Sequence, residues 1–455
     1  MPDIDRSSER LTPAEPTLAR RLGAFDATMI VMGGIIGAGI FVNPSNVARV
    51  VHTPALVLGA WVIGGVIALI GAFVYAELAA LRPRVGGQYA YLRDAYHPLV
   101  AFVYGWTLLL VVQTGGMAGA AIICGRYFRE LTGVAVPEQV IAGLVLAVLT
   151  VVNCLGVRAG SNLQSGLMLT KLLAIAMLIG VGFVIAAPAP TMAPAAPVES
   201  GGAGGLAGAM IPVLFAYGGW QTASFISGEM RDTRRDLPRG MLIGVIGVIV
   251  LYLAVTYVCL RVLGVDGLAA TKTPASEVMR RALGARGARL IALGIAVSTM
   301  GFLSQSVLTA PRVYYAMARD GVFFSAVGKL DPRTRAPVVA IVLQGVWAAA
   351  IALTGKYDQI LNYVEAIDVL FFGLTGASLI IFRMRERREG ASPETADRVR
   401  VPGHPFTTLV FVLACWAVGV TTVVQQPRSA GIGVGILLVG VFVYRFWSRK
   451  AVGAG

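Results

Sequence analysis

The stretch that decides the fold is Gly33-Gly34-Ile35-Ile36-Gly37-Ala38-Gly39-Ile40-Phe41, inside the first long apolar run of the chain. Four glycines in seven positions disfavour a helix, because each costs about 1 kcal/mol relative to alanine. In lipid, a broken helix leaves backbone N–H and C=O groups without water to bind them. Such a break persists where the freed groups line a cavity and bind something polar. The stretch therefore predicts a broken membrane helix.

A second interruption lies in the sixth apolar run, at Phe215-Ala216-Tyr217-Gly218-Gly219-Trp220. Its paired glycines weaken the helix for the same reason. Two broken helices at corresponding places in two halves of a membrane protein are typical of secondary transporters, whose sites lie near the midplane of the bilayer. The pattern therefore favours a carrier, although hydropathy alone leaves an ion channel open.

Composition places the chain in a membrane. Of its 455 residues, 56% are hydrophobic and 14% are charged, and the mean hydropathy is +0.74. These values are far too apolar for a soluble protein. We predict an all-α membrane protein with twelve transmembrane helices, because twelve apolar runs are long enough to cross a hydrocarbon core of about 30 Å. The predicted spans are 24–50, 54–81, 97–125, 138–155, 160–187, 206–230, 239–264, 287–318, 337–354, 358–383, 405–424 and 429–448.

The net charge of +14 does not indicate a nucleic-acid-binding protein, because its distribution is that of a membrane protein. Most Lys and Arg residues fall on one side of the membrane once the N-terminus is placed in the cytoplasm. We therefore expect no nucleic-acid partner, both termini in the cytoplasm, and a multi-pass location in the lipid bilayer of the cytoplasmic membrane. The densest clusters on the predicted inner side are Arg231, Arg234, Arg235 and Arg239, and then Arg383, Arg385, Arg387 and Arg388.

The predicted organisation is a pair of five-helix units, each of which begins with a broken helix. Because five is an odd number of crossings, the second unit must run in the opposite sense, which makes an inverted repeat. The last two helices lie outside the repeat. The expected divisions are a cytoplasmic tail at 1–22, a first repeat at 23–187, an external Pro/Ala/Gly-rich linker at 188–205, a second repeat at 206–383, a cytoplasmic loop at 384–404, two further helices at 405–448 and a cytoplasmic tail at 449–455.

The chain carries no indication of an enzyme, a cofactor or a metal site. It lacks HExxH, P-loop and GxSxG motifs, and its three histidines lie at the edges of apolar runs. The four cysteines, Cys124, Cys154, Cys259 and Cys415, form no CxxC pair, so we expect them to be small buried hydrophobic residues. We expect no cleavable signal peptide, because residues 1–22 are polar and of mixed charge.

The first break offers two poles of opposite character. The helix after it begins near Ile40, so its first N–H groups are unpaired at the midplane and attract an anion such as a carboxylate. The helix before it ends near Ile36, where free carbonyls attract a cation such as an ammonium, and carbonyls of Phe215–Trp220 add to them. Two such poles about one α-carbon apart fit a zwitterionic α-amino acid. The alternative is a glycine cluster that lets helices pack closely.

Lys171 is the one basic residue that we place deep within an apolar run, the fifth. A buried lysine is costly and is a functional hypothesis by default. We expect its ammonium to pair with free carbonyls of the first break as a fixed cation, and burial would also let it lose and regain a proton. The alternative is a lysine that snorkels to the membrane surface.

Four acidic residues lie in or near apolar runs. Glu365 and Asp368 are three residues apart in the tenth run and share a helix face, so they are candidates for a cation site or a proton site. A solvated helix end is the alternative. Glu77 and Glu229 lie near the inner ends of the second and sixth runs, close to many arginines, where ion pairs of an inner gate and simple anchoring are both open.

Aromatic residues inside the second break are candidates for lining an apolar pocket. They are Phe215, Tyr217 and Trp220, and their place in the break distinguishes them from ordinary core aromatics. Outside the spans we expect two short helices, at 86–93 and 273–283.

These stretches resemble the amino acid–polyamine–organocation (APC) superfamily of transporters, most closely the LAT-type (L-type amino acid transporter) branch, over nearly the whole chain. Together the stretches are highly specific, although each alone is not. They are Gly37-Ala38-Gly39-Ile40-Phe41, Tyr75-Ala76-Glu77-Leu78, the run PRVGGQYAY from Pro83 to Tyr91, Val152-Asn153-Cys154, Leu169-Thr170-Lys171-Leu172-Leu173, Phe215-Ala216-Tyr217-Gly218-Gly219-Trp220 and Ala318-Arg319-Asp320-Gly321.

The resemblance implies a LeuT-like fold with a 5+5 inverted repeat and alternating access. It implies that the carboxylate of the substrate binds at Gly37–Gly39 and that its ammonium binds backbone carbonyls of the two breaks. It also implies that Lys171 occupies the place of a sodium ion and that Phe215 is an aromatic gate. The residues expected to bind the substrate are Ile36, Gly37, Ala38, Gly39, Ile40, Phe215, Ala216, Gly218 and Trp220.

Two departures from the family pattern have consequences. Eukaryotic LAT-type proteins use a cysteine between segments three and four to join a partner glycoprotein, but the loop 126–138 contains none here. We therefore expect no disulfide-linked heavy-chain partner. Segment ten carries Glu365 and Asp368 where relatives are neutral, which weakens the case for strictly neutral substrates.

We predict a sodium-independent carrier of L-amino acids, chiefly neutral ones, that works by exchange or by proton symport. A cationic amino-acid or polyamine exchanger is the first alternative. A non-transporting amino-acid sensor with the same fold is the second.

Overall fold

The computed structural model describes residues 18–188, 202–354, 357–389, 399–425 and 427–452. This part of the chain consists of helices and loops, with one isolated β-bridge between Leu22 and Met230. The helices are α1 (Ala24–Ile35), α2 (Gly39–Val51), α3 (Pro54–Leu81), α4 (Gln88–Ala95), α5 (Pro98–Thr107), the π-helix η1 (Leu108–Val112), α6 (Gln113–Thr132), α7 (Glu138–Cys154), α8 (Val157–Val184), α9 (Gly202–Tyr217), the 3₁₀-helix η2 (Trp220–Glu229), α10 (Asp236–Ala270), α11 (Pro274–Thr309), α12 (Pro311–Arg319), the 3₁₀-helix η3 (Ser325–Gly328), α13 (Val338–Thr354), α14 (Tyr357–Arg388), α15 (Phe406–Gln425) and α16 (Pro427–Val452).

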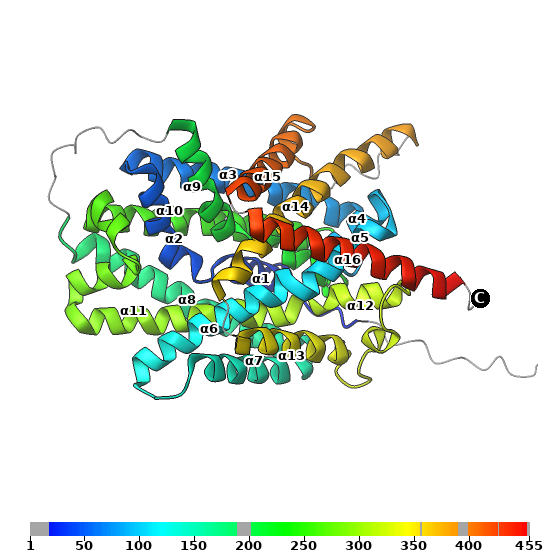
Figure 1. Ribbon diagram of the computed structural model, residues 1–455, viewed down its shortest axis with the longest axis horizontal. Coiled ribbons are helices and arrows are strands. Elements are labelled where there is room, and N and C mark those ends of the chain that lie inside the picture. The colour runs from blue at the N-terminus through cyan, green and yellow to red at the C-terminus, as the bar shows by residue number, and fades with distance from the viewer. Residues whose placement is uncertain (1–17, 189–201, 355–356, 390–398, 426, 453–455) are drawn as a thin grey trace, which may run out of the picture.

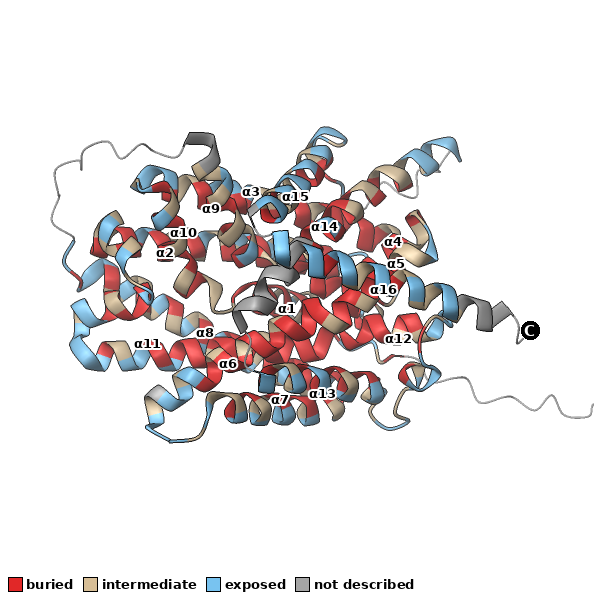
Figure 2. Cartoon of the chain, viewed as in Figure 1, coloured by how far each residue is buried: buried red, intermediate tan, exposed pale blue. Residues whose placement is uncertain are grey.

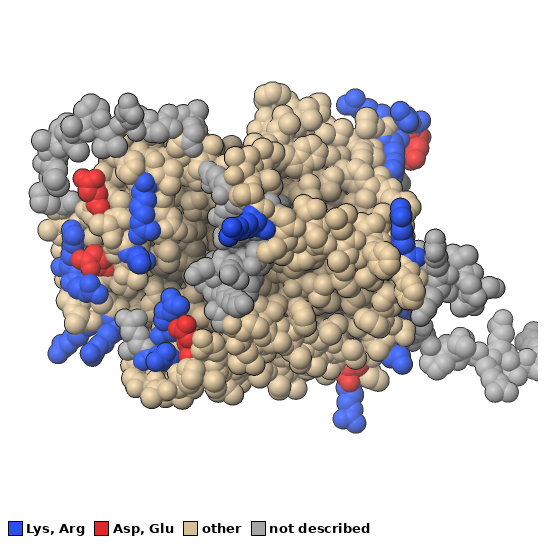
Figure 3. All heavy atoms as spheres, viewed as in Figure 1, with Lys and Arg blue, Asp and Glu red and all other residues tan. Residues whose placement is uncertain are grey.

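Seven helices in the described part of the chain are long and apolar enough to cross a membrane, and the bent pair α1–α2 makes an eighth. Three further apolar helices are shorter: α7, α13 and the portion Gly431–Trp447 of α16. In Figure 3, charged residues lie mostly toward the two ends of the visible face, with a broad and largely uncharged band between them. The prediction of an all-α, multi-pass membrane protein is therefore confirmed.

The first broken helix lies in the middle of the bundle. Helix α1 packs against α10, η2, α8 and α11, and α2 packs against α9 and α10. Figure 1 shows α1 near the centre of the molecule, while Figure 2 shows it within the most buried region and α15 and α16 with exposed residues along them. Segments that are far apart in the sequence thus enclose the glycine-rich stretch on several sides.

Helix α8 shows why a membrane helix can present a polar face inward. Its buried residues include Ser161, Gln164 and Lys171, which recur at helical spacing on one side. Leu169 and Leu173 lie on the exposed side, with 51% and 71% of their surfaces accessible. Because the surroundings are hydrocarbon, apolar side chains face outward and polar ones are left to the interior, where they can find partners.

Both predicted breaks occur in the structure. Helix α1 ends at Ile35 and α2 begins at Gly39, and the two are bent by 43°. Helix α9 ends at Tyr217, and a 3₁₀-helix follows from Trp220. Glycines account for the second break, because Gly219 adopts φ +111°, a conformation that residues with a Cβ rarely adopt.

The two expected short helices also occur. The first is α4, at Gln88–Ala95, two residues later than predicted. The second is the beginning of α11, where Pro274 starts the helix and Gly284, at φ +65°, interrupts its helical geometry.

The close approach of the two breaks leads to a stability prediction. A Cβ on Gly219 would lie 2.1 Å from the carbonyl oxygen of Gly34, and φ is positive there. Gly219→Ala should therefore destabilise the fold by about 1–3 kcal/mol or more, because of backbone strain and steric clash. Thermal unfolding of the detergent-solubilised protein should show a lower transition temperature.

Gly143→Ala is the matched control, because Gly143 lies in helix α7 with no atom within 4 Å of the added Cβ. That variant should be neutral or slightly more stable, since alanine favours a helix. Equal transition temperatures for the Gly219 variant and wild type would contradict this description of the break.

Candidate functional site

The backbone between α1 and α2 is partly accessible only over a short stretch. Ile36 and Ile40 are fully buried, whereas Gly37, Ala38 and Gly39 between them are half-buried. Gly37 N–H donates to Ile35 O at 2.9 Å, which turns the chain. Gly39 and Ile40 begin α2, so their N–H groups have no acceptor in that helix. The break therefore presents N–H groups and the positive end of a helix dipole.

Lys171 of α8 binds the carbonyl end of the first break, as the sequence led us to expect. Its side chain is fully buried, and Nζ donates to Ile36 O and, at 3.5 Å, to Gly33 O. Gly301 of α11 makes room for it, because a Cβ there would lie 3.2 Å from Cε of Lys171. The Ile36 carbonyl, predicted to bind a substrate ammonium, thus already accepts from the ammonium of this lysine.

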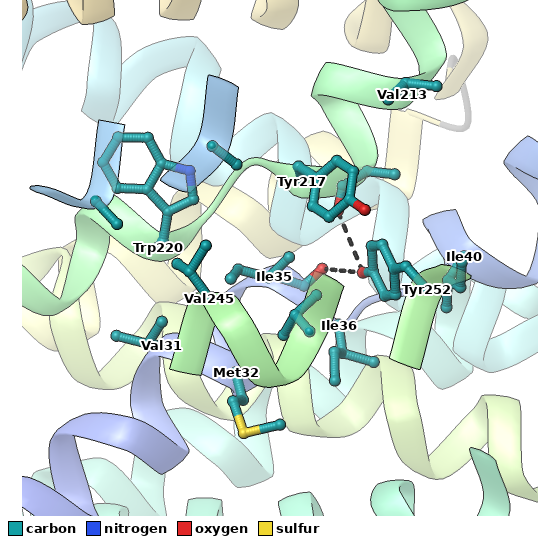
Figure 4. Close-up of a cluster of buried hydrophobic side chains, with 14 of the residues drawn as sticks. Val31, Met32, Ile35, Ile36, Ile40, Val213, Tyr217, Trp220, Val245 and Tyr252 are labelled. Atoms are coloured by element: carbon teal, nitrogen blue, oxygen red, sulfur yellow. Dashed lines mark hydrogen bonds between the residues drawn. The ribbon is translucent and has the colours of Figure 1, made fainter. Parts of the chain in front are cut away.

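Tyr252 of α10 joins the two breaks, and the sequence analysis did not identify it. Its hydroxyl donates to Ile35 O at 3.0 Å and to Ala216 O at 3.2 Å, and the side chain is fully buried. Figure 4 shows the ring of Tyr252 between Ile36 and Ile40, with dashed lines to the two carbonyls. The one available signal was a tyrosine in the otherwise apolar run VIVLYLAV.

Ser298 and Phe302 of α11 are two further neighbours of the first break that sequence reasoning missed. Ser298 Oγ donates to Gly37 O at 3.3 Å. A Cβ on Gly37 would lie 3.7 Å from the ring of Phe302, so this ring borders the half-buried glycines. Ser298 and Phe302 are four residues apart, on one face of α11.

The two breaks touch each other at two places. Gly219 approaches Gly34, as described above, and a Cβ on Gly39 would lie 3.4 Å from Cα and Cβ of Ala216. Gly218 is half-buried, and its N–H donates to Phe215 O at 3.2 Å. The predicted substrate-binding residues of the two segments therefore lie together, with the exception of Trp220.

The three aromatic residues of the second break have different surroundings. Phe215 remains 42% exposed, whereas Trp220 is buried against Tyr75, at 4.8 Å between ring centroids, and against Phe372, at 5.7 Å. In Figure 4 the indole lies on the opposite side of the view from Ile40. Tyr217 is buried and donates to Trp61 O at 3.2 Å. Phe215 is thus the aromatic residue of this break that remains accessible.

The acidic pair of the tenth run is described in part. Asp368 of α14 is half-buried and interacts electrostatically with Tyr75 and Tyr104. Glu365 belongs to α14, but its side chain lies outside the described residues. The structure gives no contact between Asp368 and the two breaks within the described part of the chain.

Two ion pairs with fully buried carboxylates lie at the end of the bundle where α3 and α14 terminate, which we call the inner end. Glu77 forms a bidentate pair with Arg383, at 2.7 Å for each bond, and accepts from Val401 N–H at 2.7 Å. Glu229 pairs with Arg312 at 2.6 Å, with both side chains 1% exposed. The ion pairs considered from the sequence therefore exist in this structure.

The described residues contain no group of three or more His, Cys, Asp or Glu side chains that could hold a metal ion. Cys124, Cys259 and Cys415 are buried and free, as expected for small apolar residues, and Cys154 is half-buried. The chemistry available at the two breaks is therefore binding: an N–H pole at Gly37–Gly39, and carbonyls of both segments held by Lys171 and Tyr252.

Known proteins are similar to this chain in sequence. A family described as amino acid permease matches residues 22–444. The chain is 29% identical to the large neutral amino acids transporter small subunit 2 of Rattus norvegicus, over 98% of this chain and 86% of that protein. It is 28% identical to the b(0,+)-type amino acid transporter 1 of Homo sapiens, over 84% of this chain and 80% of that protein.

A bacterial relative is similar over nearly its full length. The chain is 28% identical to the serine/threonine exchanger SteT of Bacillus subtilis, over 94% of this chain and 96% of that protein. These relatives are transporters and not enzymes, and they confirm the resemblance to the APC superfamily and its LAT-type branch. The chain belongs to the amino acid permease family, a family of membrane transporters within the APC superfamily.

Proposed function

We propose that this protein carries L-amino acids, chiefly neutral ones, across the cytoplasmic membrane by alternating access and without sodium. The observation that carries the proposal is the pairing of half-buried N–H groups at Gly37–Gly39 with a buried lysine ammonium on the carbonyls just before them. The break binds a carboxylate at one pole, while the place that a sodium ion would need already holds a fixed cation.

The topology proposed from the sequence agrees with the helices. Each predicted span coincides with one helix or with consecutive helices, and the two broken segments are the first and the sixth. We propose twelve crossings, a LeuT-like 5+5 inverted repeat and cytoplasmic termini, which make the inner end of the bundle the cytoplasmic end.

In the proposed pose, the carboxylate accepts from N–H groups of Gly37, Ala38, Gly39 and Ile40. The ammonium donates to carbonyls of the second break, at Phe215, Ala216 or Gly218. Ala216 O and Ile36 O already accept one hydrogen bond each, but a carbonyl has a second lone pair. The side chain of the substrate lies against Phe215 and Phe302, two aromatic residues that border the breaks.

Lys171 supplies the coupling cation in this proposal. An ammonium bound to Ile36 O and Gly33 O holds the carbonyl end of α1 in place, as a bound cation would. Exchange of one amino acid for another and symport with a proton both operate without sodium. Asp368 is the observation that favours the second candidate function, a cationic amino-acid or polyamine exchanger, because a carboxylate in the bundle attracts cationic side chains.

The carrier is proposed to act without a disulfide-linked partner. The loop between α6 and α7 contains no cysteine in residues 126–138. The name of one relative describes it as a small subunit, but this chain has no cysteine in that loop for a disulfide to a second chain.

The direct test is uptake of labelled leucine or alanine into proteoliposomes, with and without unlabelled amino acid inside. Uptake that requires internal substrate indicates exchange, and uptake driven by a pH gradient alone indicates symport. A protein that binds amino acids without any uptake would be the non-transporting sensor. Competition by a panel of amino acids identifies the substrate class.

The carboxylate pole can be tested at Gly39. A valine there would place methyl groups against Ala216, because a Cβ on Gly39 would lie 3.4 Å from Cα and Cβ of that alanine, and would cover the N–H groups of the break. Gly39→Val should abolish binding, and an amine that lacks the carboxylate should fail to compete for uptake. Gly180→Val, on an open helix face, is the control and should retain uptake. Unchanged uptake in a well-expressed Gly39→Val protein would refute the site.

Sodium independence follows from the position of Lys171. Uptake in choline or potassium buffer should equal uptake in sodium buffer, because the lysine ammonium already binds the carbonyls of Gly33 and Ile36. Initial rates measured at matched ionic strength check this. A steep dependence on sodium would contradict the role proposed for Lys171.

The acids of α14 decide between the two substrate classes. In a Glu365→Gln, Asp368→Asn double variant, exchange of leucine or alanine at neutral pH should persist if the substrates are neutral. If the substrates are cationic, uptake of arginine or lysine should be the main activity and should fall roughly tenfold, equivalent to about 1.4 kcal/mol for one partly screened contact. Loss of neutral amino-acid exchange would contradict both substrate assignments and indicate a proton site essential to every transport step.

A further inference from the structure

A group of buried polar side chains near the inner end has unmet hydrogen bonds. It comprises one face each of α3, α4, α5, η2 and α12, and we call it the tyrosine cluster. Among the described residues, five of its polar atoms make no hydrogen bond of good geometry, although every one of these side chains is fully buried. Thr375 is the polar side chain beside the hydroxyl of Tyr75, and Ser224 is the one beside the hydroxyl of Tyr91. The members of the tyrosine cluster are Tyr75, Gln88, Tyr91, Tyr104, Ser224 and Tyr314, and the five atoms are Tyr75 Oη, Gln88 Nε2, Tyr91 Oη, Ser224 Oγ and Tyr314 Oη.

The members lie together around Tyr104. The hydroxyl of Tyr104 donates to Gln88 Oε1 at 3.0 Å and interacts electrostatically with the hydroxyls of Tyr75 and Tyr314. The rings of Tyr75 and Tyr91 meet edge to face, with centroids 6.3 Å apart. Ser224 lies against the start of α4, because a Cβ on Gly87 would be 2.3 Å from its Oγ.

The free-energy cost of burying these polar groups indicates that something else forms hydrogen bonds with them. A buried hydroxyl or amide without a partner costs about 1–3 kcal/mol, so several poorly bonded groups side by side would be a large penalty in a protein of ordinary stability. Buried water removes the penalty where several polar groups converge, since each water makes two to four hydrogen bonds. The tyrosine cluster offers both donors and acceptors to a chain of such waters.

Asp368 of α14 lies at one end of the tyrosine cluster. It interacts electrostatically with Tyr75 and Tyr104, and the ring of Phe371, on the next turn of α14, packs 5.2 Å from that of Tyr104. Besides Tyr75 and Tyr104, Cys415 of α15 is the titratable group that faces this carboxylate in the described part of the chain. Glu365 lies one turn away on α14, with its side chain outside the described residues.

Other charges on α14 and α4 are farther away or paired. Arg383, paired with Glu77, lies about 22 Å further along α14, at 1.5 Å per residue. Arg93 of α4 pairs with Asp320, and Tyr89 donates to the same carboxylate at 2.8 Å. Asp368 therefore has polar neighbours in the tyrosine cluster but no paired cation among the described residues.

The other end of the tyrosine cluster lies on α4, a helix whose opposite face is at the inner rim. Gln88 and Tyr91 lie on the buried face of this helix, while Arg93 and Asp94 on its other face form ion pairs at the rim. Gly86 N–H donates to Phe225 O at 3.3 Å, which fixes the start of α4 against η2. The tyrosine cluster thus lies between Asp368 of α14 and α4, the helix whose other face forms these ion pairs.

We propose that the tyrosine cluster holds a chain of internal water through which Asp368 exchanges protons with the cytoplasmic side. This inference rests on the proposed carrier function in its proton-symport mode. A proton that arrives adds to a carboxylate oxygen of Asp368, and each water that gives up a proton accepts one from its neighbour. In symport, Asp368 gains its proton while the carrier is open to the other side of the membrane and releases it along this chain to the cytoplasm, so one cycle moves one proton across.

Hydroxyl-radical labelling of the full-length protein in detergent tests the water directly. Tyr75, Tyr91, Tyr104 and Tyr314 should be oxidised despite their burial, because radicals form on water beside them. Tyr217 is the buried control, since its hydroxyl donates to Trp61 O. Labelling of the cluster tyrosines no greater than that of Tyr217 would overturn the proposal.

A transport experiment tests the proton path. The Tyr75→Phe, Tyr91→Phe double variant removes two hydroxyls that make no hydrogen bond of good geometry, with Thr375 and Ser224 as the polar side chains beside them. Proteoliposomes with an internal pH dye report proton movement when an amino-acid gradient is applied, and preloaded proteoliposomes report exchange. Tyr257→Phe, at an exposed position on α10, is the matched control.

Proton movement should fall roughly tenfold in the double variant and in Asp368→Asn, while exchange by the double variant and both activities of the Tyr257 control should change by less than about twofold. Loss of proton movement in Asp368→Asn but not in the double variant would overturn the path through the tyrosine cluster. Amino-acid uptake by wild type without proton movement would overturn the path and leave the carrier function standing. Wild type without any uptake would overturn the carrier function itself, and with it the proton path.

Discussion

The structure depends on how the backbone groups freed between α1 and α2 are satisfied. A break at the centre of a membrane protein cannot rely on solvent, and each unpaired group would cost several kcal/mol in hydrocarbon. Three side chains from three helices meet the carbonyls of the break: Lys171, Tyr252 and Ser298. The N–H groups that begin α2 receive no such partner from their own helix. This asymmetry supports the proposed site, because the protein satisfies one pole itself and the proposed substrate would bind the other.

The same constraint explains why the helices around the break are more polar inside than outside. Lys171, Gln164 and Ser161 lie on one buried stripe of α8, and Thr222, Gln305 and Thr309 form a hydrogen-bonded group between η2 and α11. Close packing of the two breaks requires glycine, because a Cβ at Gly219 would lie 2.1 Å from the carbonyl oxygen of Gly34. Glycine residues therefore both terminate these helices and allow the helix ends to pack in contact.

The sequence predicted the parts of this site that have a local signal. Glycines disrupt a helix wherever they are clustered, so the breaks were found to within about two residues. A lysine deep in an apolar run needs a partner, and carbonyls of the nearby break were the available ones. Tyr252, Ser298 and Phe302 were missed because each is a residue type that apolar helices tolerate. Only the three-dimensional packing of α10 and α11 brings these residues to the break, and periodicity within one helix carries no information on that contact.

Phe215 and Trp220, which the sequence analysis assigned to one site, differ in burial. Phe215 and Trp220 are five residues apart on either side of a break, so their directions depend on the backbone at Gly218–Gly219. Trp220 turns toward Tyr75 and Phe372, whereas Phe215 stays accessible. A helix rule such as i, i+4 does not apply across an interrupted helix. Side-chain directions near such a break therefore follow from the structure and not from the spacing of residues.

The ion pair between Glu229 and Arg312 indicates how a carrier of this design can close firmly and still open. Both side chains are 1% exposed, and Arg21 and Leu22 N–H groups bind Glu229 O, which holds the N-terminal segment against the inner end. Removal of one partner would strand a buried charge at a cost of about 3–5 kcal/mol, so the closed state demands both. A movement that exposes both ions together restores their hydration, and the net free energy of a buried pair relative to hydrated ions is small. A buried ion pair therefore makes the closed arrangement specific without lowering its free energy much, which suits the alternation between two states that we propose for this protein.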